Sequence, residues 1–136
     1  MSAPVLLDTH ALVWWVSAPS QLSAPARAAV DGAESVLVSA ASGWEMALLV
    51  DAGRLALDRP VRTWLRDVMT RDRIRPVPID MDIATTSVAL ARRGFHRDPA
   101  DRFLYATAAR ERVPLVTKDV LIQAFAQSDR EVTAIW

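Results

Sequence analysis

Five acidic residues stand at positions from which they could act together on one cation. Asp8 ends the stretch VLLD, Glu45 lies in SGWEM, Asp98 and Asp101 lie in HRDPADR, and Asp119 ends LVTKD. Carboxylates that converge repel one another unless a positive charge lies between them. Because the chain has no cysteine and no pair of histidines at the spacing of metal ligands, the oxygen donors favour Mg²⁺ or Mn²⁺ over Zn²⁺.

The same acids also have a structural explanation at the starts of helices. Capping of a helix N-terminus is expected of three of them: Asp8, Asp98 and Asp119. Asp101 would then interact favourably with the helix dipole, and the spacing Ser42-x-x-Glu45 is that of a capping box. Both explanations stay open for each residue alone, whereas the convergence of all five acids favours a metal centre.

The elements that must position these acids follow from alternating apolar runs and helical patterns. Strands are predicted at residues 5–7, 35–39, 74–79, 115–117 and 132–136. Helices are predicted at residues 9–16, 23–32, 42–53, 60–70, 82–93, 99–111 and 119–125. Five strands separated by helices indicate an α/β fold with a doubly wound parallel sheet and helices on both faces. The prolines of 74–79 place that strand at an edge, and sites in such sheets form outside the carboxyl ends of the strands.

Length and composition set outer bounds on the fold and its setting. The 136 residues are predicted to form a single domain, 1–136, and the 51% hydrophobic content excludes a disordered chain. No apolar run approaches the roughly 20 residues of a membrane span, and no basic segment precedes an apolar one as in a secretion signal. The absence of cysteine fits a reducing cytoplasm. Sixteen basic residues balance sixteen acidic ones, so net charge gives no support to broad nucleic-acid binding.

Four segments carry a resemblance to a known family. They are LLDTHALVWW (6–15), SAASGWEMALLVDAGRL (39–55), HRDPADRFLYATA (96–108) and LVTKD (115–119). Together they resemble the PIN-domain family, and within it the VapC-type toxins of toxin–antitoxin pairs. The resemblance implies a PIN-like doubly wound sheet and a Mg²⁺-dependent endoribonuclease that a small antitoxin protein holds inactive.

The resemblance also implies roles for individual acids. The acidic residues of the family fall on Asp8, Glu45, Asp101 and Asp119, while Asp98 belongs to a DPxDR form found in some members. RNA hydrolysis needs an activated water, relief of charge in the transition state and help for the leaving oxygen, which one or two Mg²⁺ ions supply. We therefore expect Asp8, Asp101 and Asp119 to be metal ligands and Glu45 to bind a second ion or orient the water, with Mn²⁺ as a substitute for Mg²⁺.

Residues beside the acids have weaker predictions. The hydroxyls of Thr9 and Thr117 would orient the neighbouring carboxylates, or else serve as strand and cap residues. Arg102 is the arginine of this region that we expect to contact RNA phosphate. His10 and His96 have no partner at the spacing of a metal site or a catalytic triad, so we expect them to be solvent-facing or packed. Four tryptophans are expected in the core or at an interface: Trp14, Trp15, Trp44 and Trp64.

Three alternative functions require residues that can be compared with this sequence. A phosphoacceptor receiver domain requires paired acids after the first strand, where LLDTH has one. A phosphatase of the haloacid-dehalogenase type requires a second aspartate two residues after Asp8, where this chain has His10. A catalytically silent PIN-like binding module stays open. The expected partners are an RNA substrate, a cognate antitoxin and a second copy of the chain in a homodimer, without a membrane.

Overall fold

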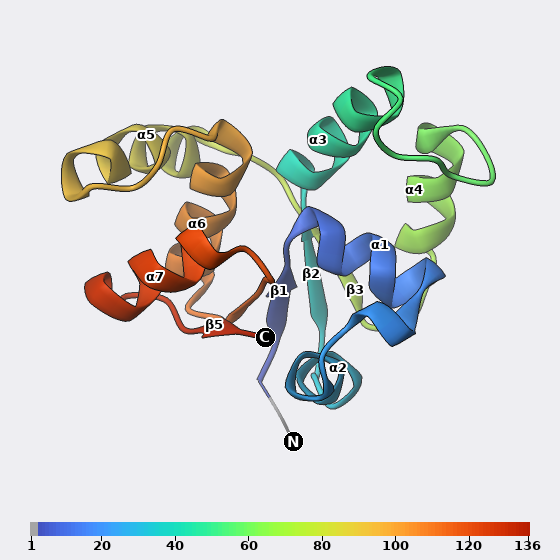
Figure 1. Ribbon diagram of the computed structural model, residues 1–136, viewed down its shortest axis with the longest axis horizontal. Helices are drawn as coiled ribbons and strands as arrows, with labels where there is room; N and C mark the ends of the chain where they lie inside the picture. The colour runs from blue at the N-terminus through green and yellow to red at the C-terminus, as the bar shows by residue number, and fades with distance from the viewer. Residues whose placement is uncertain (1–2) are drawn as a thin grey trace.

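A five-stranded parallel sheet forms the centre of the molecule in a computed structural model that describes residues 3–136 (Figure 1). The strands are β1 (Val5–Leu7), β2 (Val36–Ser39), β3 (Ile74–Val77), β4 (Leu115–Val116) and β5 (Ala134–Ile135). Their order is β3-β2-β1-β4-β5, and every neighbouring pair is parallel. The predicted α/β sheet and the edge position of the proline-bearing strand are therefore confirmed.

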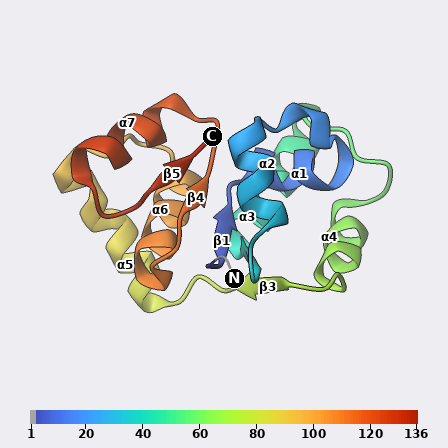
Figure 2. The same cartoon turned by 90° about the horizontal axis from the view of Figure 1, so that it is seen from below.

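Helices cover both faces of this sheet. They are α1 (Thr9–Ser17), α2 (Ala24–Asp31), α3 (Ala40–Asp51), α4 (Val61–Met69), α5 (Met81–Ala89), α6 (Pro99–Glu111) and α7 (Val120–Asp129). Figures 1 and 2 show α1, α2 and α4 on one side of the sheet and α5, α6 and α7 on the other. Within residues 3–136 no helix combines the length and the apolarity needed to cross a bilayer. The cytoplasmic location expected from the sequence stays a prediction.

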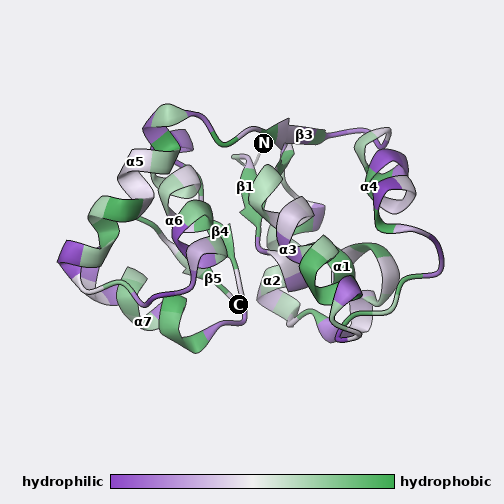
Figure 3. Ribbon diagram, turned by 90° about the horizontal axis from the view of Figure 1, so that it is seen from above, coloured by the Kyte–Doolittle hydropathy of each residue, from purple (hydrophilic) through white to green (hydrophobic). Residues whose placement is uncertain are grey.

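The hydrophobic core is divided in two by the sheet. Val5 and Leu7 point into one cluster with α1, α2 and α4, whereas Leu6 points into the other with α5, α6 and α7. Leu37 of β2 and Leu115 of β4 lie on either side of Leu6 in the sheet, and both belong to the same cluster as Leu6. This alternation follows from the two-residue period of a strand, and each fully buried side chain contributes about 1.5–3 kcal/mol. In Figure 3, β1 and most of α1 are coloured hydrophobic, whereas hydrophilic residues colour much of α4.

The start of α3 differs from the prediction. The helix begins at Ala40, because the Ser39 hydroxyl accepts the Ala41 N–H at 3.0 Å and acts as its N-cap. Ser42 is fully buried, and its hydroxyl accepts a hydrogen bond from Thr9 at 3.1 Å. The capping box of Ser42 and Glu45 is therefore wrong, and the Glu45 side chain is free of that role.

Two other helix ends differ from the sequence prediction. The helix expected at 82–93 is an α-helix only to Ala89 and continues as a 3-10 turn over Leu90–Arg93, which Gly94 closes at a φ of 91°. Glycine suits this left-handed conformation because it has no Cβ. The helix expected to end at Phe125 runs to Asp129 and stops where Arg130 takes a positive φ of 68°.

Candidate active site and metal centre

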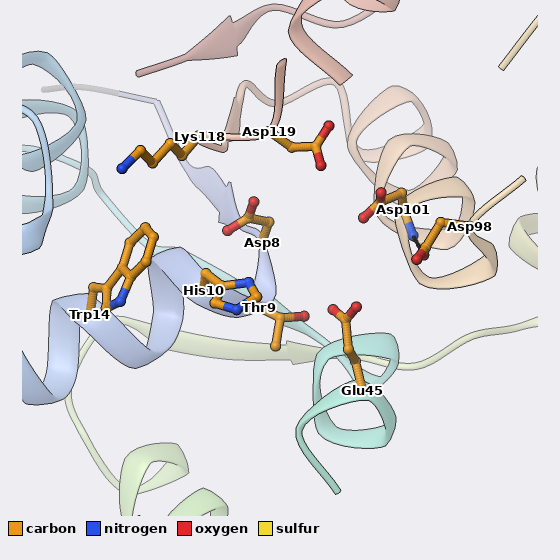
Figure 4. A pocket seen from close by; sticks show the side chains of 9 residues that line it. All are labelled: Asp8, Thr9, His10, Trp14, Glu45, Asp98, Asp101, Lys118 and Asp119. Atoms are coloured by element: carbon orange, nitrogen blue, oxygen red, sulfur yellow. Dashed lines mark hydrogen bonds between the residues drawn. The ribbon is translucent and has the colours of Figure 1, made fainter. Parts of the chain in front are cut away.

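A cavity of about 380 Å³ lies at the carboxyl ends of β1 and β4 (Figure 4). Its lining residues are Asp8, Thr9, His10, Trp14, Glu45, Asp98, Asp101, Lys118 and Asp119. From β1 the chain proceeds toward β2 and β3 on one side, while β4 and β5 lie on the other. The cavity therefore sits at the switch point of the sheet, where ligand sites of open α/β folds form. All five predicted acids line it.

Four separate elements bring these acids together. Asp8 follows β1 directly, and Asp119 follows β4 by three residues. Glu45 lies in the second turn of α3, the helix that follows β2, and Asp101 lies in the first turn of α6. Because α6 runs antiparallel to the strand that it precedes, its N-terminus comes to the same rim as the strand ends. Figure 4 shows the carboxylates approaching one another from these different directions.

Three of the carboxylates that line the cavity also cap helices, each through its Oδ1 atom. Asp8 Oδ1 accepts the Ala11 N–H at 2.8 Å, and Asp119 Oδ1 accepts two N–H groups of α7, both at 2.9 Å. Asp98 Oδ1 caps α6 through the Asp101 N–H at 3.0 Å. Each cap occupies one oxygen and limits the rotation of the carboxylate, so the other oxygen can serve a ligand. The two explanations that the sequence left open are thus compatible.

The environment of Asp8 disfavours its charged form. Burial raises the pKa of this carboxyl from 3.8 to about 6, although hydrogen bonds from Thr117 and the Ala11 N–H act in the opposite direction. The negative charge of Glu45 raises the same pKa further. A cation in the cavity would reverse this cost, because it stabilises the carboxylate form.

Asp101 has a similar environment on the opposite side of the cavity. Burial and, to a smaller extent, the charges of Asp98 and Asp119 raise the pKa of its carboxyl to about 6. The hydrogen bond with His96 lowers it. Two raised carboxyl pKa values in one cavity are the mark of a functional site more often than of a structural one.

The donor set fits a hard divalent cation. One ligand atom each of His96, Asp101 and Asp119 lies within 4.8 Å of the other two. Asp8 and Glu45 add carboxylates along the same cavity wall. Carboxylate oxygens are preferred by Mg²⁺ and Mn²⁺, so the residues present suit the ion expected from the sequence.

Some neighbours of the acids have other partners than expected. Thr9 donates to the Ser42 hydroxyl at 3.1 Å, and its predicted role in orienting the neighbouring acids stays a prediction. Thr117, fully buried, accepts the Asp119 N–H at 3.0 Å and lowers the pKa of Asp8, as expected of a residue that orients these acids. The guanidinium of Arg102 donates to the backbone carbonyl of His96 at 2.7 Å through Nε. Its predicted contact with RNA phosphate stays a prediction.

Sequence reasoning missed the role of His96. Its Nε2 lies 2.7 Å from Asp101 Oδ2, and its ring stacks on Phe95, with centroids 4.5 Å apart. His96 is packed, which is one of the two environments expected of it, but its contact with Asp101 was not predicted. The sequence HRDP could have indicated this contact, because the turn before Pro99 brings His96 back against the first turn of α6.

An aromatic and cationic wall faces Asp98 and Asp101 across the cavity (Figure 4). Lys118, the only lysine of the sequence, lies 5.6 Å from the centroid of the Trp14 ring, within the range of a cation–π contact. His10 lies one helical turn before Trp14, with ring centroids 5.5 Å apart. Trp14 packs against the core cluster on one face of the sheet, as expected, and it also lines the cavity. This wall, defined by His10, Trp14 and Lys118, was not foreseen.

Comparisons with known proteins agree with this geometry. The PIN domain family matches residues 5–127. Ribonuclease VapC22 from Mycobacterium tuberculosis is 42% identical over 115 residues, which cover 85% of this chain and 86% of that protein.

Solved structures share the fold at lower identity. VapBC2 from Rickettsia felis, crystallised with a DNA fragment from its promoter, superposes with a TM-score of 0.62 at 12% identity and covers 96% of both chains. FitAcB from Neisseria gonorrhoeae gives a TM-score of 0.60 at 22% identity, covering 96% of this chain and 95% of that one.

Proposed function

The chain belongs to the PIN-domain family, whose match extends over residues 5–127, and on that premise we propose a Mg²⁺-dependent endoribonuclease that acts as the toxin of a toxin–antitoxin pair. The observation that carries this proposal is the cavity in which five carboxylates meet at the switch point of the sheet. The name of the 42% identical relative, a ribonuclease, supports RNA as the substrate. Mn²⁺ is expected to replace Mg²⁺, since both prefer oxygen ligands.

The carboxylates divide the catalytic work according to their positions. Asp8, Asp101 and Asp119 would hold the cation, because they face the cavity from β1, α6 and the end of β4. A bound divalent cation supplies charge relief and a water of lowered pKa. Glu45 enters from α3 and is placed to orient the attacking water or to accept its proton. Their caps hold Asp8 and Asp119 in fixed orientations, which reduces the rearrangement that catalysis would require.

The wall of His10, Trp14 and Lys118 suits an RNA strand. Lys118 can contact a phosphate next to the bond that is cut. The rings of His10 and Trp14 can pack against a base or ribose, as aromatic side chains do in proteins that bind single strands. We expect this wall, and not Arg102, to contact the substrate, because the Arg102 guanidinium already donates to the carbonyls of Phe95 and His96.

The proposed partners are a cognate antitoxin and a second copy of this chain. Trp44 and Leu48 are 48% and 49% exposed on α3, the helix that carries Glu45. A tail that inserts Arg or Lys among the carboxylates and anchors apolar residues nearby would suit this arrangement. Structural neighbours described as a toxin–antitoxin complex support such a partner. A homodimer would show twice the 15.0 kDa chain mass in light scattering.

The ribonuclease proposal is tested with purified chain and RNA. We expect cleavage with Mg²⁺ or Mn²⁺, none with EDTA, and growth arrest on expression that a co-expressed antitoxin relieves. Structured and unstructured RNAs that stay intact with either metal, together with harmless expression, would contradict it.

A further inference from the structure

The hydrogen bond between His96 and Asp101 joins a loop to the candidate metal centre. His96 Nε2 lies 2.7 Å from Asp101 Oδ2, and only 20% and 17% of the two side chains are exposed. A carboxylate accepts hydrogen bonds and cannot donate them. In this contact Nε2 therefore carries the proton, and its N–H donates to Asp101 Oδ2.

The His96 ring is held in place by an aromatic support. It stacks on Phe95 at an interplanar angle of 20°. Phe95 is 3% exposed and packs against Tyr105 and Phe125, with ring centroids at 5.3 Å and 4.8 Å. The ring that donates to Asp101 thus rests on a buried cluster and not on a freely moving loop.

The backbone of this loop is fixed as well. Arg102, the residue after Asp101, donates through Nε to the His96 carbonyl at 2.7 Å and through Nη2 to the Phe95 carbonyl at 3.3 Å. The chain enters the loop at Gly94, whose φ of 91° is accessible to few other residues. Arg102 and His96 together tie the first turn of α6 to the loop that precedes it.

We infer that His96 is a positioning residue for the metal-binding carboxylate of Asp101. The inference rests on the proposed metal-dependent function. Asp98 and Asp119 repel the Asp101 carboxylate from the same cavity, and the His96 N–H holds one of its oxygens against that repulsion. Oδ1 is then directed to the cation, in the way that ligating carboxylates are commonly oriented by a hydrogen-bond donor behind them.

Three variants test this inference by Mn²⁺ binding without RNA, measured by calorimetry. His96→Phe keeps a ring on Phe95 but has no donor, and it should weaken Mn²⁺ binding about 10–100-fold. His96→Gln places an amide N–H at a similar reach. Its Mn²⁺ affinity should therefore stay within about threefold of that of the parent. Val68→Ala removes buried volume from the core cluster on the other face of the sheet, away from this loop, and it should lower the melting temperature in EDTA while Mn²⁺ binding stays unchanged.

Each other outcome overturns the inference in a recognisable way. If His96→Gln binds Mn²⁺ as weakly as His96→Phe, the imidazole nitrogen is itself a ligand. If His96→Phe binds as tightly as the parent, His96 has no part in the site, although the proposed function stands. If the folded parent does not bind Mn²⁺ at all, the metal centre and the proposed function fail together.

Discussion

At the scale of the residue, the acids of the cavity serve the fold and the site at once. Asp8 and Asp119 each bind N–H groups of the helix that they open through Oδ1. Both carboxylates also line the cavity, where burial raises the pKa of Asp8 and makes its ionised form costly. A residue that is an ideal cap can therefore also be a metal ligand.

The raised pKa of Asp8 makes a prediction about stability in EDTA. Its folded pKa of about 6 lies above the ordinary 3.8, so the ionised carboxylate destabilises the fold above pH 6 by an amount on the order of 3 kcal/mol. Asp8→Asn keeps the cap and should exceed the parent in free energy of unfolding at pH 7.5. This advantage should disappear as the pH falls from about 6 toward 4. Chemical denaturation across that range measures it, and an advantage that does not change with pH would contradict the burial of a charge.

A second prediction concerns Lys118. Lys118→Met keeps an apolar side chain near Trp14 but removes the charge, and it should raise KM with little change in kcat. The salt dependence of binding to a single-stranded oligonucleotide should lose about 0.7 of its logarithmic slope, the contribution of one phosphate contact. Lys118→Arg, which keeps the charge, is the control. An unaltered slope in Lys118→Met would show that RNA does not contact this wall.

The sequence predicted the acids but not the contacts that depend on loop geometry. Asp8, Glu45 and Asp119 were found because strand ends and helix starts can be located from hydrophobic pattern. His96 was missed because its distance from Asp101 depends on how the loop before Pro99 turns back. Trp14 and Lys118 meet across segments that are more than a hundred residues apart, and no local pattern indicates such a contact.

At the scale of the element, helix starts decide where side chains enter the cavity. α3 begins at Ala40 with Ser39 as its cap, which brings Glu45 into the second turn of the helix. The sequence offers serine at 39 and at 42, and both are buried, so their hydrogen bonds distinguish them: Ser39 accepts the Ala41 N–H, whereas Ser42 accepts from the Thr9 hydroxyl. The end of α7 was not predicted because Arg130 adopts the positive φ that ends the helix. Glycine or asparagine at this position would have indicated the helix end in the sequence.

The buried pair of Thr9 and Ser42 allows a test of how α1 and α3 are joined. Ser42→Ala leaves the Thr9 hydroxyl without its acceptor and should cost about 1–3 kcal/mol of folding free energy. Adding Thr9→Val removes the unpaired hydroxyl at nearly constant shape, so the double variant should be more stable than Ser42→Ala alone. Urea unfolding of the parent, Ser42→Ala, Thr9→Val and the double variant gives the coupling energy between the two hydroxyls. Additive losses would show that the two hydroxyls do not interact.

At the scale of the whole molecule, the order β3-β2-β1-β4-β5 accounts for the position of the site. β1 is the central strand, with β2 and β3 on one side and β4 and β5 on the other. The chain continues from β1 into α1 and from β4 into α7. The cavity forms at the carboxyl ends of these two strands. The sheet and its helical layers were predictable because each strand is a short apolar run between clear helical patterns. A single domain over 1–136 stays a prediction, with the family match covering residues 5–127.

The central claim is that the cavity acids form one metal-dependent active site, and Asp101→Asn tests it against Asp80→Asn. Asp80 caps a helix by accepting the Ile83 N–H at 2.9 Å, but it is not among the residues that line the cavity. Asn at position 80 preserves that cap, and Asp101 is not itself a cap, since Asp98 caps α6, so both variants should fold. Because burial raises the pKa of Asp101 to about 6, Asp101→Asn should be at least as stable as the parent in EDTA.

The measurement is the rate of RNA cleavage per folded molecule as a function of Mn²⁺ concentration. Asp101→Asn should lose nearly all cleavage and require more Mn²⁺ for what remains, whereas Asp80→Asn should follow the parent curve. If folded Asp101→Asn cleaves RNA with the rate and Mn²⁺ dependence of the parent, the Asp101 carboxylate has no part in catalysis, and the account of this cavity as the metal-dependent active site is wrong.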